Sequence, residues 1–143
     1  MKLFTIGFTK KSAEAFFTTL QRATVSKIVD VRLNNVSQLA GFTKKNDLRY
    51  FAKTICGIDY IHLPDFAPTQ EMLDEYKKAR CTWSDYEGQF LKLMATRQVE
   101  RTDRELLEGG CFLCSEPLAD RCHRRLVVEY LTGKWEGVEI IHL

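Results

Sequence analysis

The chain has 143 residues, 45% of them hydrophobic, and a formal net charge of +2 from 21 Lys and Arg against 19 Asp and Glu. This length suits one domain with one core, so we expect residues 1–143 to form a single α/β domain. The composition excludes a disordered or fibrous chain. No apolar run is long enough for a signal peptide or a membrane span, which predicts a cytoplasmic protein with no membrane partner. So small a net charge leaves nucleic acid a possible partner.

The first half of the chain reads as strands separated by helices. Three apolar runs predict short buried strands: Leu3–Ile6, Lys27–Arg32 and Ile58–Leu63. Ser12 suits the N-cap of a helix whose apolar residues recur at helical spacing. A shorter helix begins after Asn46 or Asp47 and ends at Gly57.

The second half begins with helices and returns to strands. Two or three helices are predicted between Thr69 and Glu108, where Ser84–Glu87 and Thr102–Glu105 both match the capping box. The elements expected after them are a strand at Cys111–Ser115, a helix from about Arg121 to Thr132, with Gly133 as its stop, and a strand at Val138–His142.

This alternation predicts a three-layer, Rossmann-like α/β domain with a mostly parallel five-stranded sheet and helices on both faces. Ligands of such sheets bind beyond the carboxyl ends of the strands. The rule selects Thr9 after the first strand, Asp30 and Arg32 after the second, and Glu116 with the Cys122 segment after the fourth. We therefore expect one site at this edge.

Asp30 and Arg32 are out of place in a buried parallel strand, which is normally apolar throughout. The two-residue period of a strand puts both on one face of the sheet. They form either a structural ion pair at the sheet edge or an acid and an anion-holding arginine beside a ligand crevice.

The cysteines cluster in one segment. Cys111 and Cys114 are three apart on a strand, so their thiols are expected to diverge rather than form half a zinc site. Cys122 is placed in the first turn of the following helix, where the helix dipole favours a thiolate. Because a reducing cytosol favours free thiols, we predict that Cys114 and Cys122 are reduced and that Cys122 is the more reactive. A carboxylate at Glu116 would oppose that reactivity.

His123 and three arginines accompany Cys122. His123 falls in line with the apolar face of the predicted helix, which fits either a core imidazole or a site residue. Arg121, Arg124 and Arg125 crowd the positive end of the helix dipole, which fits either a solvated helix start or a bound anion.

Three motifs together resemble one known family. They are the opening Thr5-Ile-Gly7-Phe-Thr9, the strand Val29-Asp30-Val-Arg32, and Cys114-Ser-Glu116 followed after five residues by Cys122-His123-Arg124. The chain resembles the domain-of-unknown-function 488 (DUF488) family over nearly its whole length. The resemblance implies an α/β domain with a site built from these motifs, whose reaction is not established. This chain has Phe8-Thr9 where the family often has His-Ser, and it has Asn35 and Ser37-Gln38 where the family often has proline and Ser-Arg.

Three functions compete. The first is an enzyme, a hydrolase or transferase acting on a phosphate-bearing small molecule, nucleotide or nucleic-acid base. Its anion would be held by Thr9, Arg32 and Arg124, and its catalytic residues would be Glu116, Cys122, His123 and Asp30, with Glu116 or His123 moving protons and Cys122 as nucleophile. The second is a binding module that holds the same ligand without turnover. The third is a metal site of Cys114, Glu116, Cys122 and His123. The leading hypothesis includes no metal and no cofactor, and no oligomeric state is predicted.

Overall fold

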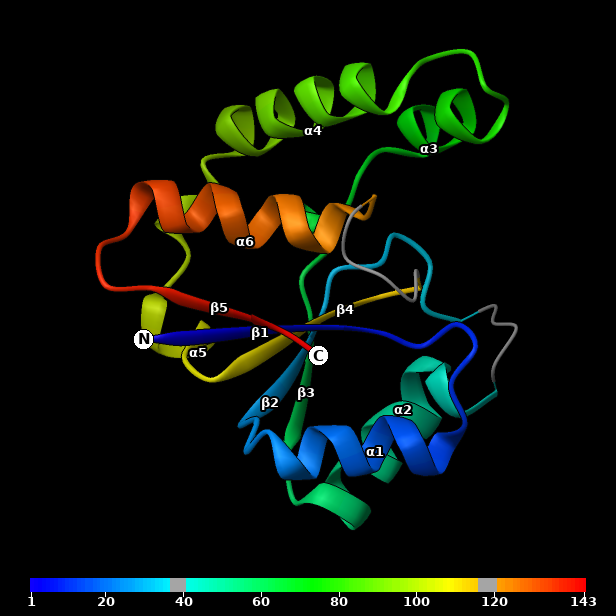
Figure 1. The fold of residues 1–143 in the computed structure, drawn as a ribbon, viewed down its shortest axis with the longest axis vertical. Coiled ribbons are helices and arrows are strands. Elements are labelled where there is room, and N and C mark those ends of the chain that lie inside the picture. The colour runs from blue at the N-terminus through cyan, green and yellow to red at the C-terminus, as the bar shows by residue number, and fades with distance from the viewer. Residues whose placement is uncertain (37–40, 116–120) are drawn as a thin grey trace.

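A computed structural model describes residues 1–36, 41–115 and 121–143. Five strands form one sheet in the order β3-β2-β4-β1-β5, and every neighbouring pair is parallel. The strands are β1 (Lys2–Gly7), β2 (Lys27–Asp30), β3 (Asp59–His62), β4 (Gly110–Cys114) and β5 (Glu139–His142). Figure 1 shows helices on both faces of this sheet. The predicted three-layer α/β architecture is confirmed, with a sheet that is parallel throughout.

The two faces carry different helices. One face holds α1 (Ala13–Arg22), α2 (Lys45–Phe51) and the π-helical turn Ala52–Cys56. The opposite face holds α3 (Gln70–Lys77), α4 (Trp83–Arg97) and α6 (His123–Lys134) (Figure 1). The short helix α5 (Arg104–Leu107) precedes β4, and single 3₁₀ turns lie at Gly41–Thr43, Pro64–Phe66 and Val99–Arg101. Within the three described ranges, no helix combines the length and hydropathy needed to cross a bilayer.

Strand β4 shows how the sequence divides the core in two. Cys111 and Leu113 pack with the α1 face, whereas Phe112 and Cys114 pack with the α4 and α6 face. Side chains alternate along a strand, so a continuous apolar run supplies both cores. The predicted divergence of Cys111 from Cys114 is therefore confirmed.

Several predicted boundaries shift. Strand β2 ends at Asp30, two residues earlier than predicted, and α6 begins at His123 with Cys122 as its N-cap. Cys122 therefore precedes the helix instead of lying in its first turn. The same helix runs through Gly133 to Lys134, beyond its predicted stop.

Both predicted capping boxes are also wrong. The box belongs to Thr82, whose hydroxyl accepts from the Asp85 backbone at 3.1 Å while the Asp85 carboxylate accepts from the Thr82 backbone at 3.1 Å. Asp103 caps α5 by accepting from the Glu105 backbone at 3.0 Å. In each case another oxygen, at a neighbouring position, satisfies the free backbone donors of the first turn.

The connections around β4 create a crevice. After β4 the chain enters α6 on one face, whereas after β1 and β2 it goes on to α1 and α2 on the opposite face. Strand β4 lies between β1 and β2 in the sheet. On each side of β4, the connections that leave the two neighbouring strands therefore run to opposite faces of the sheet. Open parallel sheets bind ligands at such switch points. The topology thus directs a site to the carboxyl ends of these three strands.

Candidate functional site

A cavity of about 1050 Å³ opens at this edge of the sheet. Its walls come from segments far apart in the sequence: Phe8 and Thr9 after β1, Arg32 to Asn34 after β2, Cys114 and Ser115 at the end of β4, Arg121 to His123 at the start of α6, and residues of α3, α4 and their connection. This volume matches the upper range of small-molecule sites in proteins.

Arg32 and Asp30 form a buried ion pair beside the cavity. Arg32 donates to Asp30 from Nε to Oδ1 at 2.9 Å and from Nη2 to Oδ2 at 2.8 Å. The Asp30 carboxylate also accepts from the Arg32 backbone at 3.1 Å and from the Tyr60 hydroxyl at 2.5 Å. Burial, with the Asp30 charge next in size, raises the pKa of Tyr60, so the phenol remains a donor. With four donors around it, Asp30 holds Arg32 in place.

One nitrogen of the Arg32 guanidinium makes no hydrogen bond to the described part of the chain. Nη2 also donates to the Thr43 carbonyl at 2.8 Å, and the guanidinium lies 5.4 Å from the centre of the Phe8 ring. Nη1 is buried and has no hydrogen-bond partner among the described residues. A buried N–H without a partner costs free energy, so this nitrogen favours an incoming acceptor.

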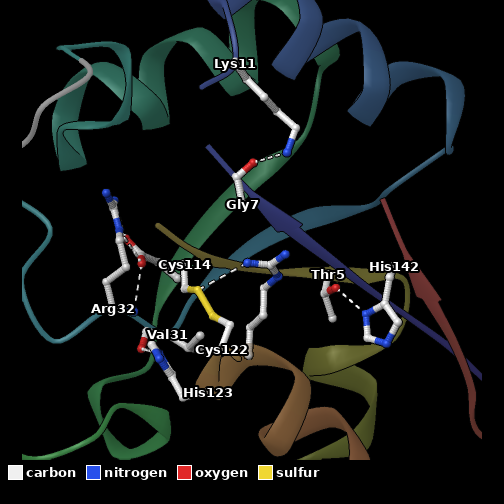
Figure 2. The surroundings of a disulfide bond; sticks show 11 residues. Thr5, Gly7, Lys11, Val31, Arg32, Cys114, Cys122, His123 and His142 are labelled. Atoms are coloured by element: carbon white, nitrogen blue, oxygen red, sulfur yellow. Dashed lines mark hydrogen bonds and ion pairs between the residues drawn. A yellow bond between two sulfur atoms is a disulfide. The ribbon is translucent and has the colours of Figure 1, made fainter. Parts of the chain in front are cut away.

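Cys114 and Cys122 form a disulfide (Figure 2). The prediction that both are reduced is therefore wrong for this structure. Cys114 ends β4 on the α6 face, and Cys122 caps α6, so the strand end and the helix start bring the two sulfurs together. Arg124, only 1% exposed, donates from Nη1 to Cys114 Sγ at 3.4 Å.

His123 lies against the end of β2. Its Nε2 is 2.7 Å from the Val31 carbonyl, and its ring centre is 5.7 Å from that of Phe90. Burial is the main cause that lowers the pKa of His123 to about 4. The hydrogen bond to Val31 acts in the opposite direction, and the positive charge of Arg124 lowers the pKa further. The imidazole is therefore neutral at pH 7. Because a carbonyl can only accept, Nε2 carries the proton and Nδ1 keeps its lone pair.

An aromatic wall, missed by the sequence analysis, lines the side of the cavity formed by α3 and α4. It consists of Tyr76, Trp83 and Tyr86. Trp83 stacks on Tyr86 with ring centres 5.2 Å apart, and Tyr76 lies 5.3 Å from Tyr86. The spacing of Trp83, Tyr86 and Phe90 on one helical face was the available signal.

The predicted site residues divide into three groups. Thr9, Arg32, Cys122 and His123 line the cavity. Asp30 and Arg124 are buried and do not belong to its lining. Glu116 lies outside the described residues.

The fold and the cavity define an open, all-parallel α/β protein with a polar and aromatic site at the carboxyl edge of its sheet. The chain belongs to the family described as domain of unknown function DUF488, whose model matches residues 12–131. No curated protein and no solved structure matches the chain.

Proposed function

We propose that the cavity binds a nucleotide, or a nucleic-acid base that carries a phosphate, and that the protein acts chemically on this ligand. One observation carries the proposal: arginines and an aromatic wall line the same cavity of about 1050 Å³. A base is flat and stacks on aromatic rings, whereas a phosphate needs cationic donors. A nucleotide combines both needs in one molecule.

The phosphate side is built around Arg32 and Arg121. Arg32 donates two hydrogen bonds to the Asp30 carboxylate, which hold its guanidinium in place and leave Nη1 for a phosphate oxygen. Arg121 is exposed and lines the same cavity. Arg121 precedes the N-cap Cys122, at the positive end of the α6 dipole. This dipole adds to the attraction for an anion.

The base side is the aromatic wall of Tyr76, Trp83 and Tyr86. Trp83 is half-buried, so part of its ring faces solvent. Stacking of one base on an aromatic side chain contributes about 1–3 kcal/mol and tolerates different bases. The wall therefore supplies affinity, and polar groups supply the choice of base.

For the chemical step we assign the proton transfer to His123 or Glu116. Nδ1 of the neutral His123 has a lone pair and its residue lines the cavity. Cys122 acts as a nucleophile only after its bond to Cys114 is reduced. Asp30 keeps a positioning role.

A non-catalytic binding module is the second candidate function. The observation in its favour is that the disulfide occupies Cys122 and four donors surround Asp30. Comparing metabolite pools after incubation with the wild type and with Glu116→Gln separates the two. A product lost in the variant supports the enzyme, and binding without any product supports the module.

The binding test uses the emission of Trp83. The chain has two tryptophans, so Trp135→Phe leaves Trp83 as the sole reporter. We expect nucleoside monophosphates to quench it, and Arg121→Gln to weaken that binding about tenfold or more. Arg125→Gln is the matched control, because Arg125 pairs with Glu87 and does not line the cavity. Equal effects of the two substitutions would reject the phosphate site.

We also propose a cytoplasmic location, based on an odd cysteine count and three cysteines outside the disulfide. In that compartment thiol systems favour reduction of the Cys114–Cys122 bond, whose cysteines are part of the cavity wall.

A further inference from the structure

Three side chains with metal-binding atoms meet at the cavity wall. Three ligand atoms all lie within 4.8 Å of one another: the sulfurs of Cys114 and Cys122 and a ring nitrogen of His123. We propose that reduction of the Cys114–Cys122 bond converts this cluster into a binding site for Zn²⁺. The disulfide in the structure is then the metal-free, oxidised form of the site.

A tetrahedral ion requires the two sulfurs to lie farther apart than they do in the disulfide. Zn–S bonds of about 2.3 Å and Zn–N bonds of about 2.0 Å place ligand atoms about 3.5 to 3.8 Å from one another. Once the covalent bond is broken, the two sulfurs are free to separate by side-chain rotation. All three ligands lie on ordered elements, since Cys114 ends β4, Cys122 caps α6 and His123 begins it. Small adjustments of these side chains therefore complete the site.

The hydrogen bonding of His123 already matches that of a metal ligand. A zinc-bound histidine usually donates its second ring N–H to a carboxylate or a backbone carbonyl, which fixes the tautomer. Nε2 of His123 has this contact, at 2.7 Å from the Val31 carbonyl (Figure 2). Nδ1 is left as the nitrogen with a lone pair for the metal.

A guanidinium and a helix N-terminus lie beside the two sulfurs. Arg124 donates to Cys114 Sγ at 3.4 Å from a buried guanidinium. Cys122 lies at the positive end of the α6 dipole. Two thiolates, one neutral imidazole and Zn²⁺ sum to zero charge, so metal binding leaves no net charge on the four groups.

Cys114, Cys122 and His123 all line the cavity, so we expect the fourth coordination position of the ion to open into it. Three protein ligands with an open position are typical of catalytic rather than structural zinc sites. A water molecule or a ligand oxygen would fill that position. The site thus brings a Lewis acid within reach of the proposed nucleotide, although it does not depend on that ligand.

The redox change balances with a thiol reductant. Reduction breaks the S–S bond, takes up two electrons and two protons from a dithiol, and yields two protein thiols and one reductant disulfide. Zinc binding then forms two Zn–S bonds and releases two protons. Oxidation by a disulfide reverses the exchange and expels the ion, so the thiol redox state controls metal occupancy.

The test uses Co²⁺ as a coloured substitute for Zn²⁺ in the full chain. Protein that has been reduced and freed of metal by chelation is titrated without oxygen, in parallel with the disulfide form. We expect one Co²⁺ per reduced chain, with sulfur-to-cobalt charge-transfer absorption and displacement by Zn²⁺, and no such absorption from the disulfide form. Equal binding by both forms, or none by the reduced form, would overturn the proposal.

Matched variants identify the ligands. Cys122→Ser keeps a good N-cap residue for α6 and so retains the fold, but it removes a sulfur and should abolish the charge-transfer spectrum. His123→Asn should weaken binding about tenfold or more. Cys81→Ser is the control, because Cys81 also lines the cavity but is not in the cluster. Loss of the charge-transfer spectrum in Cys81→Ser, or unchanged binding in His123→Asn, would reject this ligand set. Nucleotide binding, read from Trp83 emission, is measured separately and can fail without affecting these results.

Discussion

Arg32 donates two parallel hydrogen bonds, of 2.9 and 2.8 Å, to the carboxylate of Asp30. Both side chains are buried, with Asp30 0% and Arg32 5% exposed. The pair ties the end of β2 to the segment that follows it, and among the described residues Nη1 of Arg32 has no hydrogen-bond partner. If the proposed phosphate site is correct, stability and binding depend on the same side chain.

Arg32→Met should destabilise the protein strongly. It leaves the Asp30 carboxylate buried without its counter-ion, which typically costs about 3–5 kcal/mol. Urea unfolding measures the change. Lys53→Met is the control, because Lys53 pairs with Asp59 on the surface, where the side chains are 65% and 73% exposed and such a pair contributes less than about 1 kcal/mol. Similar losses in both variants would show that Asp30 tolerates isolation.

Trp83→Ala should weaken nucleotide binding by about tenfold, since one stacked base contributes about 1–3 kcal/mol. Calorimetric titration measures the dissociation constant. The matched control is Trp135→Ala, because Trp135 packs near Arg104 and is not part of the cavity lining. A larger loss of affinity in the control would place the ligand elsewhere.

The stability of the metal-free disulfide form should fall in acid because of His123. Its pKa is lowered from 6.5 unfolded to about 4 in the fold, so folding favours the neutral ring. This contribution is fully present above pH 6.5 and is lost as the pH falls toward 4, up to about 3 kcal/mol in total. Urea unfolding across this range measures it. His123→Gln, whose amide can still donate to the Val31 carbonyl, should flatten the slope, and an unchanged slope would contradict the burial of the ring.

Thiol mapping should locate the disulfide directly. Alkylation of unfolded, unreduced protein should modify Cys56, Cys81 and Cys111, and peptide mass spectrometry should find Cys114 joined to Cys122. In the folded protein Cys111 should stay unmodified, because complete burial raises the pKa of its thiol. Five modified cysteines without a reductant would restore the prediction of reduced thiols.

The order of elements and the parallel sheet were predictable because each strand is a short apolar run and the apolar residues of the helices recur at helical spacing. The strand rule selected residues at the carboxyl edge of the sheet, and of these Thr9, Arg32, Cys122 and His123 line one cavity, whereas Asp30 does not. The disulfide was not predictable in the same way, because the helix begins at His123, two residues later than predicted, and Cys122 is therefore its N-cap beside the end of β4. The aromatic wall depends on how α3 and α4 pack over the sheet, and local periodicity carries no information about that docking.

The two sides of the cavity differ in how the chain supplies them. The aromatic wall comes from one continuous stretch, 76–86, between β3 and β4, whereas the opposite side collects the ends of β1, β2 and β4 and the start of α6. Substitutions within that single stretch can change which ring is stacked without moving a strand or the cysteine pair. Under the proposed function, the surface that stacks on a base and the edge that carries the chemistry therefore come from separate parts of the chain.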